Sequence, residues 1–218
     1  MTDSTQPDVK VWDPFVRLFH WSLVAAFLVA YFVEAEDSTL AVHVWAGYAV
    51  GGLVVLRIIW GFVGTKHARF SDFLFRPFAA VRYLFDLFGG RARRYLGHSP
   101  AGAWMVFALL LGLSATVLSG MALYGQEESK GPFAAFFAGA NEAITFANPA
   151  YADDDGEEAE GQVQREGGDG GQFKDVHEVA ANLALVLALL HIGGVVLASV
   201  AHRENLARSM VTGRKRPE

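Results

Sequence analysis

The chain has 218 residues, of which 52% are hydrophobic and 13% aromatic, and its formal net charge is −5. This length fits one domain, or one domain with a large insertion. Cysteine is absent, which excludes disulfides, cysteine-held zinc, iron–sulfur clusters, thiol catalysis and the covalent attachment of c-type haem. Any metal or cofactor must therefore be held by histidine, methionine, carboxylate or backbone groups.

Four long apolar segments indicate an integral membrane protein rather than a mildly acidic soluble one. They lie at about residues 16–34, 42–64, 101–125 and 176–201. Each supplies the roughly 20 residues that a helix needs to cross the hydrocarbon core, and none has the charged face of a helix in a soluble bundle. The sequence therefore predicts an all-α, integral membrane four-helix bundle of one domain, with an acidic loop inserted at residues 126–175.

The distribution of basic residues predicts the orientation of this bundle. Lysine and arginine are concentrated in the amino-terminal arm, in the connection between the second and third segments, and in the carboxyl tail, whereas residues 126–175 hold 12 acidic and 3 basic residues. Because cytoplasmic loops are enriched in lysine and arginine, we expect both termini in the cytoplasm and the acidic loop outside. Residues 73–88 mix arginine with aromatic residues and are expected to lie along the lipid at the inner surface.

Four of the seven histidines lie within or at the ends of the apolar segments, namely His20, His43, His177 and His191. Ionisable residues in lipid-embedded helices are functional candidates by default, although each one alone is also explained by a hydrogen bond to a neighbouring helix. His177 and His191 are 14 residues apart, which places them on nearly the same helix face and roughly 21 Å apart. His43 matches the depth of His177, and His20 matches that of His191 more loosely.

Two histidine pairs inside a helical bundle suit two haems b. Imidazole is a good iron ligand, and a bundle core is a usual cofactor site. Glycines in the second, third and fourth segments leave room for flat macrocycles, although Gly47 and Gly51 alone are better explained by a close helix contact. Arg57 lies on the face of His43, where it either meets haem propionates or extends to the headgroups.

Other chemistry is poorly supported by the sequence. His177-Glu178 lacks the second histidine of the H-E-x-x-H zinc motif, and the chain has neither a nucleophile elbow nor a phosphate-binding loop. Electron transfer needs no catalytic acid–base pair on this chain. An electron-transfer subunit and a quinone-linked oxidoreductase therefore both remain open.

Several short strings of this sequence occur together in one known family. They are Val11-Trp12-Asp13-Pro14, His20-Trp21, His43-Val44-Trp45-Ala46-Gly47-Tyr48, Arg57-Ile58-Ile59-Trp60-Gly61, Tyr95-Leu96-Gly97-His98-Ser99-Pro100, His177-Glu178, and His202-Arg203-Glu204-Asn205-Leu206. The combination resembles the bacterial cytochrome b-561 and nickel–iron hydrogenase cytochrome b subunit family, which usually has Asn where this chain has Ser99. The resemblance implies a di-haem b cytochrome of the bacterial inner membrane that passes electrons between a periplasmic partner and the quinone pool.

The resemblance also implies roles for particular residues and partners. The four membrane histidines, His20, His43, His177 and His191, are similar to the axial haem ligands of the family, and His98 belongs to a string on the cytoplasmic side, where it faces propionates or quinone or is ordinary surface structure. The expected partner is a c-type cytochrome or a hydrogenase, and no nucleic acid is expected. Two further hypotheses are a quinol-linked oxidoreductase acting directly on a small oxidant such as superoxide, and a haem-free anchor or transporter with a histidine proton relay.

Overall fold

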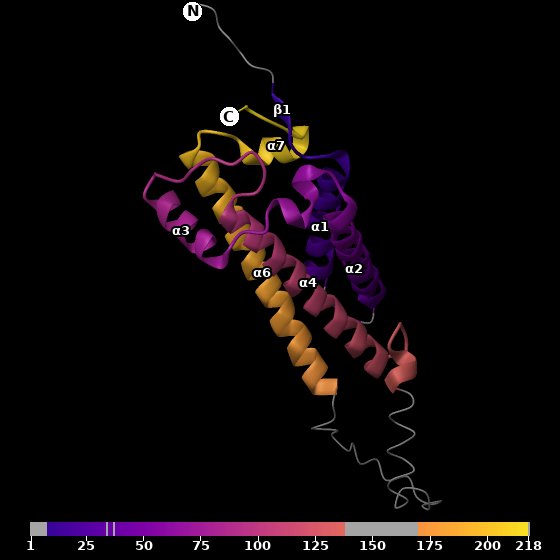
Figure 1. Cartoon of the computed structure of the whole chain (residues 1–218). Coiled ribbons are helices and arrows are strands. Elements are labelled where there is room, and N and C mark those ends of the chain that lie inside the picture. Colours follow the sequence, from indigo (N-terminus) through magenta and orange to yellow (C-terminus); the bar gives the residue numbers. More distant parts are fainter. Residues whose placement is uncertain (1–7, 34, 37, 138–169, 218) are drawn as a thin grey trace, which may run out of the picture. The chain divides into compact units, whose positions relative to one another are not determined.

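The computed structural model describes residues 8–33, 35–36, 38–137 and 170–217, and this part of the chain is mostly helical. Its four long helices are α1 (Pro14–Phe32), α2 (Leu40–Val63), α4 (Pro100–Glu127) and α6 (Gly170–Ala201), shown in Figure 1. All four are long and apolar enough to cross a membrane, in agreement with the four predicted spans. α6 begins earlier than predicted, because the polar residues before its apolar run are also helical.

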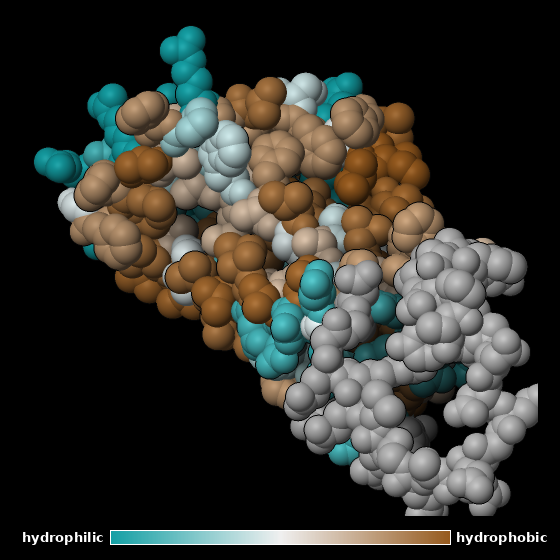
Figure 2. Space-filling view, turned by 90° about the horizontal axis from the view of Figure 1, so that it is seen from below, coloured by the Kyte–Doolittle hydropathy of each residue, from teal (hydrophilic) through white to brown (hydrophobic). Residues whose placement is uncertain are grey.

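The long helices expose apolar side chains that water would not tolerate in such number. Phe62 on α2, Leu111 on α4 and Val200 on α6 are 70%, 73% and 71% exposed. Figure 2 shows apolar residues over much of the face that it views. Soluble proteins rarely expose large contiguous apolar patches, whereas a helix in lipid satisfies its own backbone and presents apolar side chains to acyl chains. The exposed surface is therefore the surface expected of a membrane protein.

The chain divides into two compact units. The larger unit comprises Met1–Ser114 and Asn182–Glu218, and the smaller unit comprises Ala115–Ala181. The larger unit therefore holds α1, α2, the beginning of α4 and most of α6. The smaller unit holds the remainder of α4 and the beginning of α6. Most of the predicted acidic loop, residues 138–169, lies outside the described residues.

The two ends of the chain meet in the larger unit. Strand β1 (Val9–Lys10) pairs antiparallel with β2 (Arg214–Lys215). Beside this pair, α7 (Leu206–Thr212) ends at Gly213, whose φ of 78° is left-handed. A Cβ atom at Gly213 would lie 2.7 Å from the carbonyl oxygen of Trp12, so only glycine fits there. Figure 1 shows β1 and α7 together, and we call this part of the unit the terminal end.

The terminal end contains a small apolar core and a buried carboxylate. The core is formed by Val11, Trp12, Val16 and Ala68, with Phe15, Trp60, Leu96 and Met210 packed against it. Asp13 caps α1 by accepting a hydrogen bond from the backbone N–H of Val16 at 2.8 Å. Its second oxygen accepts hydrogen bonds from Trp60 Nε1 at 3.2 Å and Thr65 Oγ1 at 2.5 Å. Asp13 therefore fastens the start of α1 to the end of α2.

Asp13→Asn is expected to destabilise the terminal end. Burial alone would raise the pKa of Asp13, but the hydrogen bonds from Thr65, Val16 and Trp60 lower it below its ordinary value, so the carboxylate is ionised. An amide can still cap α1, but it offers one acceptor oxygen in place of two, and a donor left unsatisfied costs about 1–3 kcal/mol. The free energy of unfolding in mixed micelles should fall by this amount, and Asp8→Asn should leave it unchanged because Asp8 is exposed.

A second polar cluster holds the carboxyl tail in place. Glu204 accepts hydrogen bonds from Arg94 Nη2 at 2.8 Å, from Arg94 Nε at 3.1 Å and from the Arg216 backbone at 3.2 Å. Lys215 Nζ lies 3.9 Å from the same carboxylate and donates to the carbonyl oxygens of Tyr95 and Leu96. Glu204 and Lys215 are both buried. We call these residues (Arg94, Glu204, Lys215 and the Arg216 backbone) the Glu204 cluster.

The connection from α2 to α4 consists of short helices and turns. It contains the 3₁₀ turns η1 (Lys66–Ala68) and η2 (Phe70–Asp72) and the helix α3 (Pro77–Phe88). Pro77 begins α3 and Pro100 begins α4, both at the first helical positions where proline is favoured. Ser99 Oγ accepts a hydrogen bond from the Gly102 N–H at 3.2 Å and so caps α4.

Candidate haem sites

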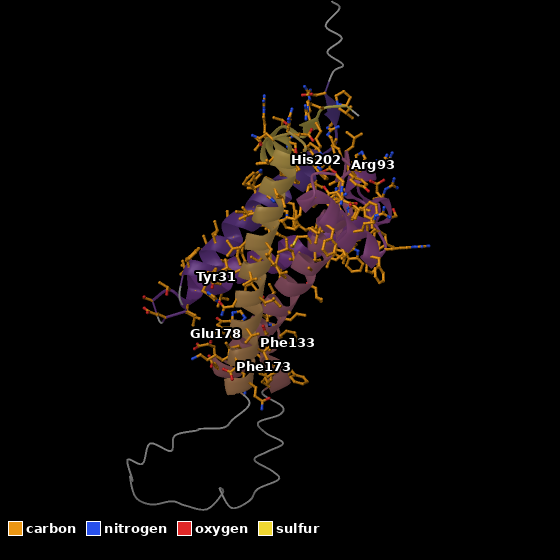
Figure 3. The ribbon with its side chains drawn as sticks, turned by 90° about the vertical axis from the view of Figure 1, so that its left-hand side faces the viewer. Tyr31, Arg93, Phe133, Phe173, Glu178 and His202 are labelled. Atoms are coloured by element: carbon orange, nitrogen blue, oxygen red, sulfur yellow. The ribbon has the colours of Figure 1, made fainter. Side chains whose placement is uncertain are left out.

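Helices α1 and α6 bring His20 and His191 together in the larger unit. Their ring centres are 6.4 Å apart and the ring planes are inclined by 55°. The register between the helices is also fixed farther from the terminal end, where Tyr31 donates a hydrogen bond to Asn182 Oδ1 at 2.8 Å. In Figure 3, Tyr31 lies away from His202 and Arg93, which are at the terminal end. The sequence predicts only loosely that His20 and His191 lie at the same depth. Because α1 begins at Pro14, His20 lies in its second turn, and the two depths agree better.

The spacing between these rings fits a shared metal. An imidazole nitrogen bonded to a metal at about 2 Å lies about 1.2 Å from its own ring centre, so two rings on opposite sides of one metal are roughly 6.4 Å apart. The Nδ1 atom of His20 is buried and has no hydrogen-bond partner. Both side chains are half-buried rather than exposed. The pair therefore fits the axial ligands of a haem.

Further unsatisfied polar atoms lie in the same unit. Within the described residues, the buried side-chain atoms that lack a hydrogen-bond partner include Arg17 Nε, Arg57 Nη1 and His98 Nδ1. Buried polar groups are nearly always paired, so each such atom requires an explanation. Two guanidinium groups are suitable donors for carboxylates, and haem carries two propionates. The donor set therefore fits a haem, whose propionates Arg17 and Arg57 would neutralise.

Arg57 is buried rather than extended to the headgroups. It is 4% exposed, and its guanidinium carbon lies 5.2 Å from the centre of the Phe70 ring. This placement argues against the alternative that Arg57 extends to lipid headgroups. Arg17 is one of the basic residues of the amino-terminal arm that predict the orientation, and the sequence alone predicts no cofactor role for it. Its spacing of three residues before His20, which puts both on one face of α1, is the signal that could have identified it.

His98 packs between two aromatic rings at the terminal end. Its ring centre lies 4.2 Å from that of Phe73 and 4.9 Å from that of Trp12. Burial lowers the pKa of His98 to about 3, and the charges of Arg57 and Lys215 act in the same direction. His98 is therefore neutral at physiological pH and offers one donor and one acceptor nitrogen. It is an enclosed side chain rather than a surface one.

His43 and His177 each have a backbone partner that selects their tautomer. His43 Nδ1 lies 3.1 Å from the carbonyl oxygen of Val33, and His177 Nδ1 lies 2.9 Å from that of Thr116. A ring nitrogen facing a carbonyl must donate, so the lone pair is on Nε2, as in metal-binding histidines. His43 belongs to the larger unit and His177 to the smaller one. Their pairing on one haem remains a prediction.

Gly120 in the smaller unit and Gly47 in the larger unit differ in what lies beside them. In the smaller unit, a Cβ atom at Gly120 would lie 2.8 Å from Cε1 of His177, so the imidazole occupies the place of a side chain. In the larger unit, a Cβ atom at Gly47 would meet nothing within 4 Å. The absence of such a neighbour does not support the close helix contact suggested for Gly47.

Gly120→Ala is expected to displace the His177 ring and weaken haem binding at that histidine. Disturbing the support of a metal ligand typically costs 10–100-fold in affinity, so we expect roughly a 10-fold loss, measured by titrating haem into the apoprotein. Gly171→Ala is the matched control, because its Cβ would have open space and it precedes the apolar run of α6. Equal affinities for the two variants would show that His177 does not need this position.

The remaining histidines form ordinary polar pairs. His67 Nδ1 lies 3.0 Å from Asp72 Oδ2, and His202 Nε2 lies 3.2 Å from the Tyr83 hydroxyl. No group of three or more His, Cys, Asp or Glu side chains that could hold a metal ion occurs in the part of the chain that the structure describes. The candidate sites therefore consist of paired histidines, as haem requires, and not of a multi-carboxylate metal centre.

The chain is similar to a known family and to several curated proteins. The family model described as prokaryotic cytochrome b561 matches residues 11–213. Curated relatives include probable Ni/Fe-hydrogenase B-type cytochrome subunits from Rhodobacter capsulatus (24% identical, covering 95% of this chain and 81% of the relative) and Azotobacter chroococcum mcd 1 (25% identical, 95% and 88%). A third, from Rhizobium leguminosarum bv. viciae, is 27% identical over 54% of this chain and 60% of its own length.

No solved structure matches the chain significantly. The family match nevertheless covers α1 through α7 and all four membrane histidines. B-type cytochromes of this family hold haem b, and the four apolar helices are those of a membrane protein. The chain therefore belongs to the prokaryotic cytochrome b561 family and is a bacterial membrane b-type cytochrome of electron transfer.

Proposed function

We propose that this cytochrome holds two haems b and passes electrons between a protein partner on the outer side and the quinone pool. The observation that carries the proposal is the 6.4 Å spacing of the His20 and His191 rings, together with unpartnered nitrogen atoms of Arg17 and Arg57 in the same unit. Haem b supplies reversible one-electron chemistry at its iron. The residues of this chain supply ligation, charge and exclusion of water.

The proposed inner site uses groups from three helices. His20 on α1 and His191 on α6 would hold the haem iron, and Arg17 and Arg57 would neutralise the propionates. Cations beside a propionate favour its ionised form and remove the cost of burying it. The apolar core of the terminal end includes Phe15 and Val16, which lie on α1 just before Arg17 and His20, and it would limit the access of water to this site. Low access of solvent and fixed charges are the features by which a protein sets a haem potential.

The proposed outer site uses His43 and His177. Each ring is oriented through Nδ1 by a backbone carbonyl, which places the lone pair on Nε2, the nitrogen that would bind iron. Ser119 Oγ lies 3.4 Å from the same nitrogen of His177, and Gly120 leaves room for the ring. The support comes from these local contacts and from the predicted depth of the two residues.

The proposed orientation places the terminal end in the cytoplasm. It contains both chain ends, joined through β1 and β2, and a chain that crosses the membrane four times must have its ends on one side. The basic residues of the connection between α2 and α4 lie on this side as well. The positive-inside rule then assigns this side to the cytoplasm.

The partners are proposed from two sources. The relatives named above are hydrogenase cytochrome subunits, which favours a hydrogenase as the electron donor. The acidic composition of residues 126–175 instead favours a basic c-type cytochrome through long-range attraction. Membrane vesicles supplied either with hydrogen or with a reduced c-type cytochrome distinguish the two, because only the true donor reduces haem b rapidly.

A pyridine haemochrome assay on the purified full-length protein tests the central proposal. We expect close to two haems b per chain, each with the low-spin spectrum of bis-imidazole ligation. Fewer than one haem per chain would contradict the proposal. A value close to one haem per chain would mean a single site. Its ligands would be the histidine pair whose replacement abolishes the haem spectrum.

A further inference from the structure

We propose that α3 and its flanking arginines form a binding site for anionic phospholipid headgroups at the membrane boundary. The evidence is the way in which α3 divides into three faces, the exposure of its arginines and the points at which the helix is attached. None of these depends on haem, so this proposal and the proposed function can fail separately.

The first face of α3 packs on the protein and fixes the depth of the helix. Tyr83 and Leu87 are buried, and the Tyr83 hydroxyl lies 3.2 Å from His202 Nε2, directly after the end of α6. Just before α3, the carbonyl oxygen of Phe75 accepts a hydrogen bond from Trp104 Nε1 at 3.2 Å, in the second turn of α4. The helix is therefore held between the ends of two membrane-spanning helices, and Figure 1 shows it beside the end of α6.

The second face of α3 is apolar and exposed. Phe78, Phe85 and Phe88 are 87%, 73% and 75% exposed, and Val81 and Leu84 lie on the same side of the helix. Figure 2 shows apolar side chains over its left-hand region, where Figure 1 places α3, with hydrophilic groups at the margin. At the depth set by Trp104, this face meets the boundary between headgroups and acyl chains, where aromatic side chains are favoured.

The third face and its surroundings are basic. Arg76, Arg82, Arg91 and Arg93 are all exposed, and the Arg93 side chain is labelled in Figure 3. Arg82 has one acidic neighbour, Asp86, at 3.8 Å. An excess of arginine next to a membrane-inserted apolar face attracts anionic lipid, and each basic residue near such a surface contributes on the order of a fivefold increase in binding. A zwitterionic lipid lacks the net charge to give this gain.

Single cysteine probes on the full-length protein test the depth of α3. Because the native chain has no cysteine, a fluorophore can be attached at Phe85→Cys on the apolar face or at Asp86→Cys on the basic face. In vesicles containing lipids brominated near the headgroup, we expect strong quenching at residue 85 and weak quenching at residue 86, with the reverse order for aqueous iodide. Equal quenching at both positions would overturn the insertion of this face.

A lipid titration in neutral detergent tests the headgroup site. The probe at residue 85 should respond saturably to short-chain phosphatidylglycerol, weakly to phosphatidylcholine and not at all to inorganic phosphate. Arg76→Gln/Arg82→Gln should weaken the phosphatidylglycerol response about 25-fold, and the matched double variant Arg208→Gln/Arg214→Gln should not weaken it. Equal effects of the two double variants would overturn the proposal in favour of non-specific charge attraction. A response that depends on protein dilution and not on lipid would overturn it in favour of contact with a second copy of the chain.

Discussion

If the chain holds two haems as proposed, replacing His191 by alanine is expected to remove about half of the haem b from the purified protein, because one of the two proposed ligand pairs loses a member. His191 lies opposite His20 with a ring spacing that fits one metal between them. The alanine variant should show one haem b per chain in a pyridine haemochrome assay. Its remaining haem should keep the bis-imidazole spectrum, since His43 and His177 are unchanged.

The matched control is His202→Ala. His202 directly follows α6, whereas His191 lies within it, and His202 is hydrogen-bonded to Tyr83, so its loss should leave the haem content unchanged. Circular dichroism of both variants establishes that their helices are intact. If His191→Ala kept its full haem content while His202→Ala lost haem, the assignment of the inner ligands would be wrong. His20→Ala provides a second check, because it should reproduce the spectrum of His191→Ala.

Glu204→Gln is expected to destabilise the protein by about 3–5 kcal/mol, the usual cost of removing one partner from a buried ion pair. The amide has the size of the carboxylate but leaves the buried Lys215 ammonium and the Arg94 guanidinium without an anion. Unfolding by denaturant in mixed micelles measures the loss. Glu128→Gln is the matched control, because the exposed pair of Glu128 and Lys130 contributes at most about 1 kcal/mol.

The same cluster predicts the acid dependence of stability. Burial alone would raise the pKa of Glu204, but the hydrogen bond from Arg94 and the charge of Lys215 hold it below its ordinary value. A carboxyl group with a lowered pKa in the folded state stabilises the protein above its unfolded pKa, and this contribution is lost as the pH falls through the folded pKa. Stability should therefore fall on acidification in the native protein, and the fall should be smaller in Glu204→Gln.

The membrane helices are the part of the fold that the sequence predicts well. Hydropathy alone sets the approximate limits of a span, because lipid requires a continuous apolar helix. The depth of His20 and His191 along antiparallel helices predicts that they lie together, and their rings are 6.4 Å apart, whereas their role as haem ligands stays a prediction. α1 begins where the N-cap Asp13 and the following Pro14 allow, and both are visible in the sequence as a signal for a helix start. This start defines the depth of His20 more closely than hydropathy does.

The contacts of the terminal end are the parts that the sequence did not predict. Arg94 and Glu204 are 110 residues apart, and no periodicity links a basic residue in one loop to an acidic residue after a distant helix. The environment of the Arg57 side chain could not be predicted from the sequence either. Its position on α2 was evident, but whether its guanidinium turned inward or toward lipid depended on Phe70, which belongs to the following connection.

The pairing of β1 with β2 has a consequence for the order in which the molecule is made. Residues next to β1 find their partners far later in the sequence, so Val11 and Trp12 have no backbone acceptor at Gly213 until that residue has been synthesised. The same late segment supplies Lys215 and Met210. The amino-terminal strand is therefore fixed in place only after the four long helices, all of which precede Gly213 in the chain, have been made.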